Sequence, residues 1–206
     1  MAEDVFLNPS ELTAGETARR ALRTAMRERR RSLPVRERLD AASTLAAHLL
    51  PELAAHEGRI AGYWAVDGEL PLHVIQAHLP ATLRWCLPVL HEDRRLRFRE
   101  WSAGQPLAPN RHGIPEPAEG ALLDADELAV VLVPLLAFDA RGQRLGQGGG
   151  WYDRSFAGRT KPCLIGIGYD WQAVSALDAT TWDVPLDAVA TPSDFHRFEH
   201  VAAPTA

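Results

Sequence analysis

The chain has 206 residues and a net charge of −5, and 46% of its residues are apolar and 24% charged. This composition is typical of a globular protein with one sizeable core, and it excludes disordered and fibrous classes. The negative charge argues against a general nucleic-acid binder, and no apolar run approaches membrane-spanning length. The acidic start of the chain is unlike a signal peptide, so we expect a cytoplasmic protein without nucleic-acid or membrane partners.

The predicted elements of the first half alternate between helices and strands. In chain order they are helices over 14–31 and 35–50, a strand over 59–65, a short helix over 71–78, a strand over 83–89 and an edge strand over 96–101. A proline-rich segment over 106–117 follows and is expected to be a loop.

The second half contains a continuous apolar run over 130–136, which is typical of a strand buried on both faces of a parallel sheet. The elements expected after it are a glycine-rich loop, a helix from about Trp151, a strand over 161–168 and a last short strand over 186–190. The alternation predicts an α/β class protein, a single-domain layered fold with a mainly parallel sheet over 14–198. Residues 1–13 and 199–206 are expected to be tails.

Two sequence features beyond the elements bear on chemistry. Cys86 and Cys163 each lie in an apolar, strand-like run and are expected to be buried thiols. The basic residues cluster early, because nine of the 21 arginines lie between Arg19 and Arg38.

Four of these arginines follow the spacing i, i+4, i+8 and i+11 and so form one stripe on the first helix. They are Arg19, Arg23, Arg27 and Arg30. Leu22, Ala25 and Met26 form the neighbouring apolar face, which is expected to pack on the body of the protein. The stripe therefore fits either a solvated helix face or the edge of a cleft.

The most informative segment is 144–154, with the sequence Arg-Leu-Gly-Gln-Gly-Gly-Gly-Trp-Tyr-Asp-Arg. It follows an apolar strand and precedes a helix, an arrangement in which backbone N–H groups can bind a phosphate. It is neither a Walker A loop nor a dinucleotide-binding motif. Arg144 adds positive charge, and Asp153 offers an oxygen ligand of the kind that Mg²⁺ prefers.

Read as a whole, this string resembles the 5-formyltetrahydrofolate cyclo-ligase (methenyltetrahydrofolate synthetase) family. Further segments match in the family's order, and together the resemblance covers about residues 15–195. These segments are Arg19-Arg20-Ala21-Leu22-Arg23, Glu69, Gly113-Ile114-Pro115-Glu116-Pro117, and Asp183 before Asp187-Ala188-Val189-Ala190-Thr191. The resemblance implies a fold related to the sugar-phosphate isomerase and CoA-transferase group.

The resemblance also implies a reaction and its ligands. The family converts 5-formyltetrahydrofolate into 5,10-methenyltetrahydrofolate, with ATP giving ADP and phosphate through an iminium phosphate intermediate. ATP is then a co-substrate and Mg²⁺ a cofactor, and we expect a monomer.

The resemblance carries over site residues position by position. Arg144 and Asp153 match catalytic positions, and Asp153 and Asp183 match the Mg²⁺ ligands. The positions that match ATP-binding residues are Arg19, Arg23, Arg144, Leu145, Gly146, Gln147, Gly148, Gly149, Gly150, Trp151 and Tyr152. Those that match folate-binding residues are Trp64, Glu69, His112, Gln147, Gly148, Gly149, Gly150 and Trp151.

Most of these residues also fit a purely structural role. Arg144 fits a surface residue in a turn, and Asp153 fits a first-turn carboxylate that stabilises its helix. Glu69 fits a charge at a helix start, and Trp64 fits a core residue of a strand. Asp187 lies close enough in sequence to take the part of Asp183.

The chain departs from the pattern of some family members at five positions. Those members have lysine at Arg19, tryptophan at His112, arginine at Gln147, lysine at Gly149 and tyrosine at Trp151. The positive charge near the loop must then come from Arg144 and the first helix. These departures predict weaker ATP binding or a shifted substrate.

Two other functions compete with the ligase. A paralogue that binds folate or nucleotide without turnover would not need the combination of Arg144, Asp153 and Asp183, which favours the enzyme. An isomerase of the sugar-phosphate group would need a general base near a substrate carbon, and no glutamate or histidine in the sequence stands out for that role.

Overall fold

The computed structural model describes residues 14–158 and 161–199. The expected tail over 1–13 lies outside the described residues, as does the expected tail over 199–206 apart from Glu199. Within the described ranges, no helix is both long enough and apolar enough to cross a membrane.

Four α-helices and two short 3₁₀ turns are found in the described chain. They are α1 (Ala14–Ser32), α2 (Val35–Leu53), α3 (His73–Ala77), η2 (Ala125–Glu127), α4 (Trp151–Phe156) and η3 (Asp170–Gln172). The two N-terminal helices agree closely with the predicted ranges, whereas the two 3₁₀ turns were not predicted.

Among the described residues, the central sheet has seven strands in the order β11-β10-β9-β6-β1-β2-β3. The strands are β1 (Gly58–Ala61), β2 (Leu83–Leu90), β3 (Leu96–Glu100), β6 (Val130–Pro134), β9 (Cys163–Ile167), β10 (Ala188–Ala190) and β11 (Phe195–Arg197). The five inner strands run parallel, and the two edge strands are antiparallel to their neighbours. The α/β class and mainly parallel sheet predicted from the sequence are therefore confirmed.

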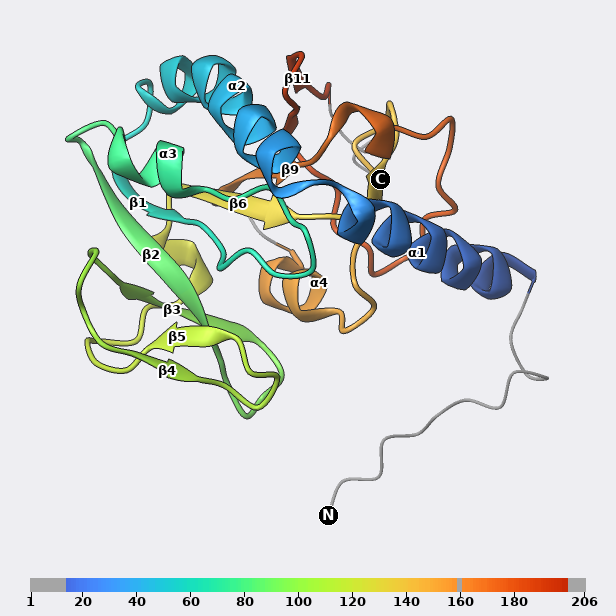
Figure 1. Ribbon diagram of the computed structural model, residues 1–206. Coiled ribbons are helices and arrows are strands. Elements are labelled where there is room, and N and C mark those ends of the chain that lie inside the picture. The colour runs from blue at the N-terminus through green and yellow to red at the C-terminus, as the bar shows by residue number, and fades with distance from the viewer. Residues whose placement is uncertain (1–13, 159–160, 200–206) are drawn as a thin grey trace.

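The sheet separates two hydrophobic cores, because successive residues of a strand face opposite sides. In β6, Val130 and Leu132 pack in the core that contains α2 and α3, whereas Val131 and Val133 pack in the core that contains Phe156 of α4. Figure 1 shows α2 and α3 on one side of the sheet and α4 on the other. Burial on both faces explains why β6 is a continuous apolar run.

One strand boundary and one thiol differ from expectation. The strand expected over 59–65 ends at Ala61. A Cβ atom on the next residue, Gly62, would lie 2.0 Å from the ring of Trp85, so the chain approaches that ring more closely than any other residue type allows. Both cysteines are thiols, but only Cys86 is buried, and Cys163 is partly exposed.

The segment 106–117, expected to be a loop, contains a two-stranded hairpin. Its strands are β4 (Leu107–Pro109) and β5 (Pro115–Pro117), which pair antiparallel. The Asn110 side chain accepts hydrogen bonds from the backbone N–H groups of His112 and Ile114, and Gly113 takes a left-handed conformation. The prolines are tolerated because this ribbon lies outside the central sheet.

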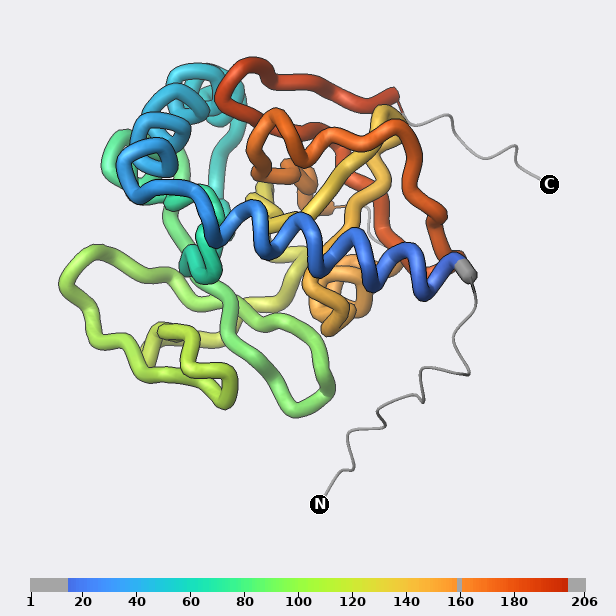
Figure 2. The backbone as a smooth tube through the Cα atoms, turned by 45° about the vertical axis from the view of Figure 1, so that its right-hand side comes forward, coloured from blue at the N-terminus to red at the C-terminus, as the bar shows by residue number. Residues whose placement is uncertain are grey.

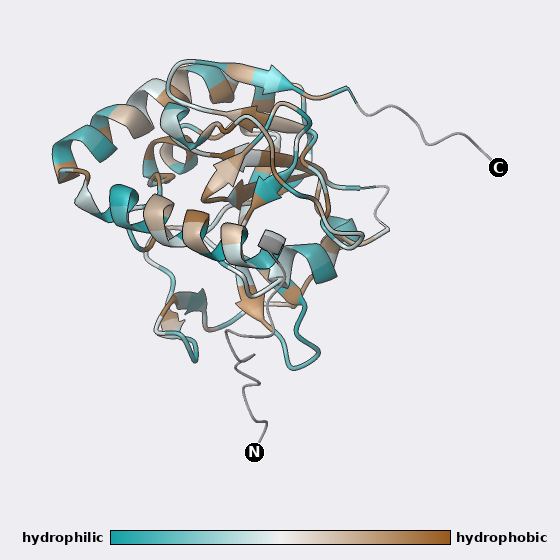
Figure 3. Cartoon of the chain, turned by 90° about the vertical axis from the view of Figure 1, so that its right-hand side faces the viewer, coloured by the Kyte–Doolittle hydropathy of each residue, from teal (hydrophilic) through white to brown (hydrophobic). Residues whose placement is uncertain are grey.

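The position of α1 determines where ligands can bind. Figure 1 shows α1 beyond the arrowhead of β6, and Figure 2 shows it running alongside the segment that contains α4. Both hydrophilic and hydrophobic residues occur along α1 (Figure 3). In a parallel sheet, the carboxyl ends of the strands are where ligands usually bind, and α1 borders that edge.

Candidate active site

The glycine loop connects a small hairpin to α4. The hairpin pairs β7 (Ala137–Phe138) with β8 (Arg144–Leu145), and the loop continues directly from it to the start of α4. Gly148 and Gly150 have φ values of 101° and 63°, a left-handed region that side chains other than glycine rarely adopt. The loop therefore follows a backbone path that requires glycine at these two positions.

Arg144 and Asp153 form an ion pair across the base of this loop. The Nη2 atom of Arg144 donates to Oδ1 of Asp153 at 2.7 Å, and Nη1 donates to the carbonyl of Val184. The Arg144 side chain is only 4% exposed and that of Asp153 is 22% exposed. Arg144 is thus not a surface residue of a turn, and Asp153 has a specific partner in addition to its place in the first turn of α4.

Asp183 forms a second ion pair close by. Its Oδ2 atom lies 2.9 Å from Nη1 of Arg19 and accepts a hydrogen bond from the N–H of Thr180 at 2.9 Å. Burial alone would raise the pKa of Asp183, but these hydrogen bonds outweigh it and the pKa is lowered. The N–H of the next residue, Val184, donates to Oδ1 of Asp153 at 3.2 Å, which links the two carboxylates.

The arginine stripe of α1 lies against these segments and contacts them through its side chains. Arg19 pairs with Asp183, and Nε of Arg23 donates to the carbonyl of Gly146 at 3.0 Å. Arg27 donates through Nε and Nη2 to Oε1 of Gln147 at 3.3 and 3.1 Å. Arg27 was part of the predicted stripe but not of the predicted site, although its spacing placed it on the same face.

Glu69 lies at the far end of this stripe. It is 8% exposed, and its Oε2 atom accepts from the N–H of Val66 at 3.1 Å. Its Oε1 atom lies 3.4 Å from Nη2 of Arg30 and accepts from Nε2 of Gln147 at 3.4 Å. The contact with Gln147 brings Glu69 and the glycine loop together, as expected for segments that leave the carboxyl ends of neighbouring parallel strands.

Burial determines the titration of the groups around Glu69. It raises the pKa of Glu69, and the Arg30 guanidinium offsets part of this rise. Burial also raises the pKa of Tyr63 and Tyr152, and the negative charge of Glu69 adds to both shifts. The two hydroxyl groups are therefore neutral over the physiological range.

The remaining folate-site residues lie at the periphery of the site. Trp64 is 39% exposed and meets the ring of Trp101 edge-on, with the centroids 6.1 Å apart, so it is not a core residue. His112 lies in the exposed turn of the β4–β5 hairpin. In that turn the contact with the end of the glycine loop comes from Arg111, whose guanidinium lies 5.1 Å from the ring centre of Trp151.

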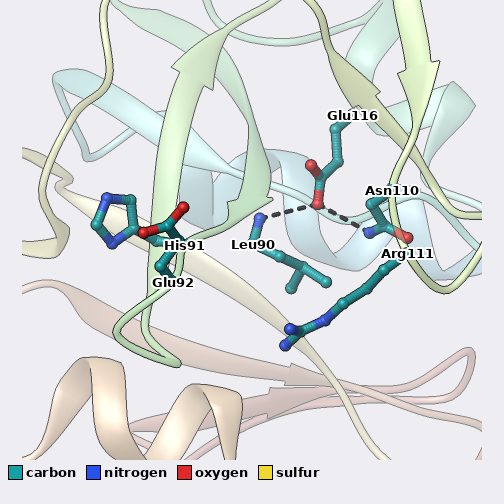
Figure 4. A pocket seen from close by; sticks show the side chains of 6 residues that line it. All are labelled: Leu90, His91, Glu92, Asn110, Arg111 and Glu116. Atoms are coloured by element: carbon teal, nitrogen blue, oxygen red, sulfur yellow. Dashed lines mark hydrogen bonds between the residues drawn. The ribbon is translucent and has the colours of Figure 1, made fainter. Parts of the chain in front are cut away.

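Arg111 also borders a cavity of about 270 Å³ beside the hairpin (Figure 4). In this cavity Glu116 accepts hydrogen bonds from the N–H of Leu90 and from the side-chain amide of Asn110, both at 2.8 Å. A second cavity of about 450 Å³ is lined by residues 156–158 and 181–185 together with Asp187, and so includes Asp183.

The residues that could hold a metal ion are few. Within residues 14–158 and 161–199, no group of three or more histidine, cysteine, aspartate or glutamate side chains is placed to bind one. Asp153 and Asp183, linked through Val184, offer two carboxylates. Mg²⁺ commonly takes one or two protein carboxylates and completes its coordination with phosphates and water, so this pair suits Mg²⁺ bound to a nucleotide.

Comparison with known proteins gives consistent matches over most of the chain. The model of the 5-formyltetrahydrofolate cyclo-ligase family matches residues 15–192. The 5-formyltetrahydrofolate cyclo-ligase of Escherichia coli K12 is 36% identical over 180 residues, covering 82% of this chain and 97% of that protein. The Haemophilus influenzae protein of the same name is 34% identical over 176 residues, covering 82% and 94%.

A solved structure is also similar. The NMR structure of Aquifex aeolicus 5,10-methenyltetrahydrofolate synthetase superposes with a TM-score of 0.77 at 27% identity, covering 91% of this chain and 96% of that one. The fold class, the family and the enzyme class predicted from the sequence are confirmed by these matches. The chain belongs to the 5-formyltetrahydrofolate cyclo-ligase family, a family of enzymes.

Proposed function

We propose that this chain uses ATP and Mg²⁺ to convert 5-formyltetrahydrofolate into 5,10-methenyltetrahydrofolate, with release of ADP and phosphate. Family membership supports the cyclo-ligase activity itself. Beyond this activity, we propose the requirement for ATP, the use of Mg²⁺ and the reaction through an iminium phosphate. The observation that carries it is the glycine loop, which lies between the Arg144–Asp153 ion pair and the arginines of α1.

The route solves a leaving-group problem. The formyl oxygen on N5 is amide-like and leaves poorly. Transfer of the γ-phosphoryl group of ATP to this oxygen gives an iminium phosphate. N10 then attacks the iminium carbon, which closes the ring, and N10 loses its proton. The C–O bond then breaks with release of phosphate and leaves the methenyl group. Phosphoryl transfer needs positioning and charge neutralisation more than a protein nucleophile.

The loop and its arginines would supply that positioning. Backbone N–H groups of the glycine loop can donate to phosphate oxygens. Arg144 offers a planar guanidinium suited to two parallel hydrogen bonds with a phosphate, a geometry that lysine cannot reproduce. Arg23 already contacts the loop at Gly146, so its remaining donors lie beside the same backbone.

Asp153 and Asp183 would hold Mg²⁺. When bound, the ion neutralises charge on the transferring phosphoryl group. In the structure each carboxylate is paired with an arginine of the proposed phosphate site, Asp153 with Arg144 and Asp183 with Arg19. Binding of the magnesium nucleotide would therefore exchange partners, because phosphates would take the arginines and the metal would take the carboxylates. Such an exchange leaves no buried charge without a counter-ion.

Glu69 and Trp64 would bind the folate. A carboxylate accepts hydrogen bonds from the N–H donors of a pterin ring, and Glu69 is held near the glycine loop by Gln147. The partly exposed ring of Trp64 offers an apolar wall.

The monomeric state and the cytoplasmic location expected from the sequence stay predictions. Light scattering on the purified protein tests the monomeric state.

One assay tests the proposed function directly. The protein is mixed with 5-formyltetrahydrofolate and ATP, with and without Mg²⁺, while the absorbance of the methenyl product and the release of ADP are followed. We expect product and ADP in equal amounts, and only with the metal present. Folate binding without ADP release under any divalent metal would instead support a binding protein without turnover.

A further inference from the structure

Arg30 is one of the most deeply buried charged residues that the structure describes, and the proposed mechanism gives it no part. Its side chain is 1% exposed although it belongs to a helix that is otherwise rich in exposed arginines. Buried arginines are rare unless they are paired, because removing a charge from water costs free energy. A charged residue that is buried beside a proposed binding site despite this unfavourable free energy is a candidate for a role in that site.

The contacts of Arg30 join three segments around one carboxylate. Nε donates to the carbonyl of Asp67 at 2.9 Å, and Nη1 donates to the carbonyl of Leu135, just after β6, at 3.3 Å. Nη2 has no hydrogen-bond partner among the described residues and lies 3.4 Å from Oε1 of Glu69. Two arms of the fork are thus fixed to the backbone, and the third is directed at the carboxylate.

Glu69 is also held from other directions. Val66 N–H donates to Oε2, and the amide of Gln147, itself held by Arg27, donates to Oε1. Arg30 supplies the positive charge in this set. We propose that Arg30 is a positioning residue for folate binding, which fixes the Glu69 carboxylate where it can accept hydrogen bonds from the pterin. This inference rests on the proposed function, in which Glu69 binds the folate.

The other groups that face Glu69 do not replace this charge. Tyr63 and Tyr152 carry neutral hydroxyls, and the electrostatic neighbour Tyr169 also has a raised pKa, of about 12, because of burial. Asp67 is an acidic neighbour and disfavours ionisation of Glu69. Because burial already raises the pKa of Glu69 and Arg30 lowers it, removal of Arg30 should raise the pKa of Glu69 further and move its ionisation to higher pH.

The test uses the full chain and compares folate binding with ATP binding. Arg30→Met removes the charge but retains an apolar stem, and Arg31→Met is the matched control. Arg31 is the next residue of α1, but its side chain is 55% exposed and pairs with the carboxylate of Asp67. The dissociation constants of 5-formyltetrahydrofolate and of ATP are measured separately, and thermal unfolding is recorded for each variant.

We expect Arg30→Met to weaken folate binding by roughly tenfold to a hundredfold, the scale for a hydrogen bond to a charged group. ATP binding should change by less than about twofold, as should both affinities in the Arg31→Met protein. Folate binding by the Arg30→Met protein should partly recover as the pH is raised, because Glu69 then ionises without help. Equal losses for folate and ATP would indicate a merely structural role and overturn the inference.

A double-mutant cycle identifies the route of the effect. In a Glu69→Gln background, Arg30→Met should add less than about a twofold loss of folate binding, because no carboxylate remains to be positioned. A full additional loss there would overturn the inference.

Arg30→Lys gives an independent reading if the methionine variant does not fold. It retains the charge without the planar fork, so we expect a smaller folate loss with the wild-type pH dependence. Loss of ATP affinity equal to the folate loss would count against the inference. Wild-type protein that does not bind 5-formyltetrahydrofolate would refute the proposed function. Wild-type binding that Arg30→Met leaves unchanged would refute only the role of Arg30.

Discussion

Replacement of Arg144 by alanine is the sharpest test of the nucleotide site. The substitution removes the guanidinium at the base of the glycine loop and leaves the loop backbone unchanged. It also removes the partner of Asp153, because Nη2 of Arg144 donates to that carboxylate at 2.7 Å. The variant should therefore lose both ligand affinity and some stability, and the two losses can be estimated separately.

A hydrogen bond from a guanidinium to a phosphate contributes about 1.5–3 kcal/mol, so ATP binding should weaken by roughly tenfold to a hundredfold. Removing one partner of a fully buried ion pair typically costs about 3–5 kcal/mol of folding free energy. The Asp153 side chain is 22% exposed and retains the N–H of Val184 as a donor. We therefore expect a smaller stability loss, of about 1–3 kcal/mol.

Calorimetric titration with ATP and urea unfolding measure the two losses. Arg141→Ala is the matched control, because Arg141 lies in the turn of the same hairpin but is 63% exposed and pairs with Asp139. Because the Asp139 carboxylate is only 1% exposed, this variant should also lose stability, but it should keep its ATP affinity. If the Arg144→Ala protein loses stability but binds ATP like the wild type, Arg144 only supports Asp153 and the phosphate role is refuted.

Three further predictions follow from individual contacts. Arg23→Ala should weaken ATP binding with little effect on folate binding. Arg29 lies off the stripe, with its guanidinium 4.3 Å from the ring centre of Trp171, so Arg29→Ala should leave ATP binding and folate binding unchanged. Similar ATP affinities of the two variants would contradict this prediction. Asp139 has a lowered pKa in the folded chain, so its carboxylate stabilises the fold above its unfolded pKa near 3.8 and this contribution is lost as the pH falls through the lower folded pKa. Asp139→Asn should accordingly be less stable than the wild type at pH 7 and approach it below about pH 4 in urea unfolding. Burial raises the pKa of Cys86 to about 12, so this thiol should react with an alkylating reagent at pH 8 only after unfolding, and rapid native labelling at this position would be inconsistent with the structure.

The parts of the fold that could be predicted from the sequence are those whose burial produces a pattern of apolar residues within a short segment. The run that became β6 has apolar residues at every position because both of its faces are covered. The β4–β5 hairpin has no such pattern. Its prolines argue against strands, and its turn depends on the side chain of Asn110 bonding two backbone N–H groups, which residue propensities do not reveal.

The same distinction holds for the site. The glycine loop is local, so its spacing alone was enough to predict an anion site on this segment. The partner of each charge is not local, since Arg19 and Asp183 are separated by 164 positions in the sequence. Only the family resemblance placed Asp183 near the loop in advance. Neither the resemblance nor the spacing indicated that the two expected metal ligands would be paired with two expected phosphate ligands.

The arginine stripe shows how far helical spacing alone can lead. The positions i, i+4, i+8 and i+11 correctly predict one face of α1, because the geometry of a helix fixes which side chains share a side. They do not predict what that face meets. Arg27 ends half-buried against Gln147, whereas Arg30, three residues later, is 1% exposed and bonded to carbonyls 37 and 105 positions away. The free energy of a buried charged group depends on these distant partners. The spacing of the arginines in the sequence therefore specifies the face of the helix on which they lie, and only the fold determines which of them is buried as the counter-ion of Glu69.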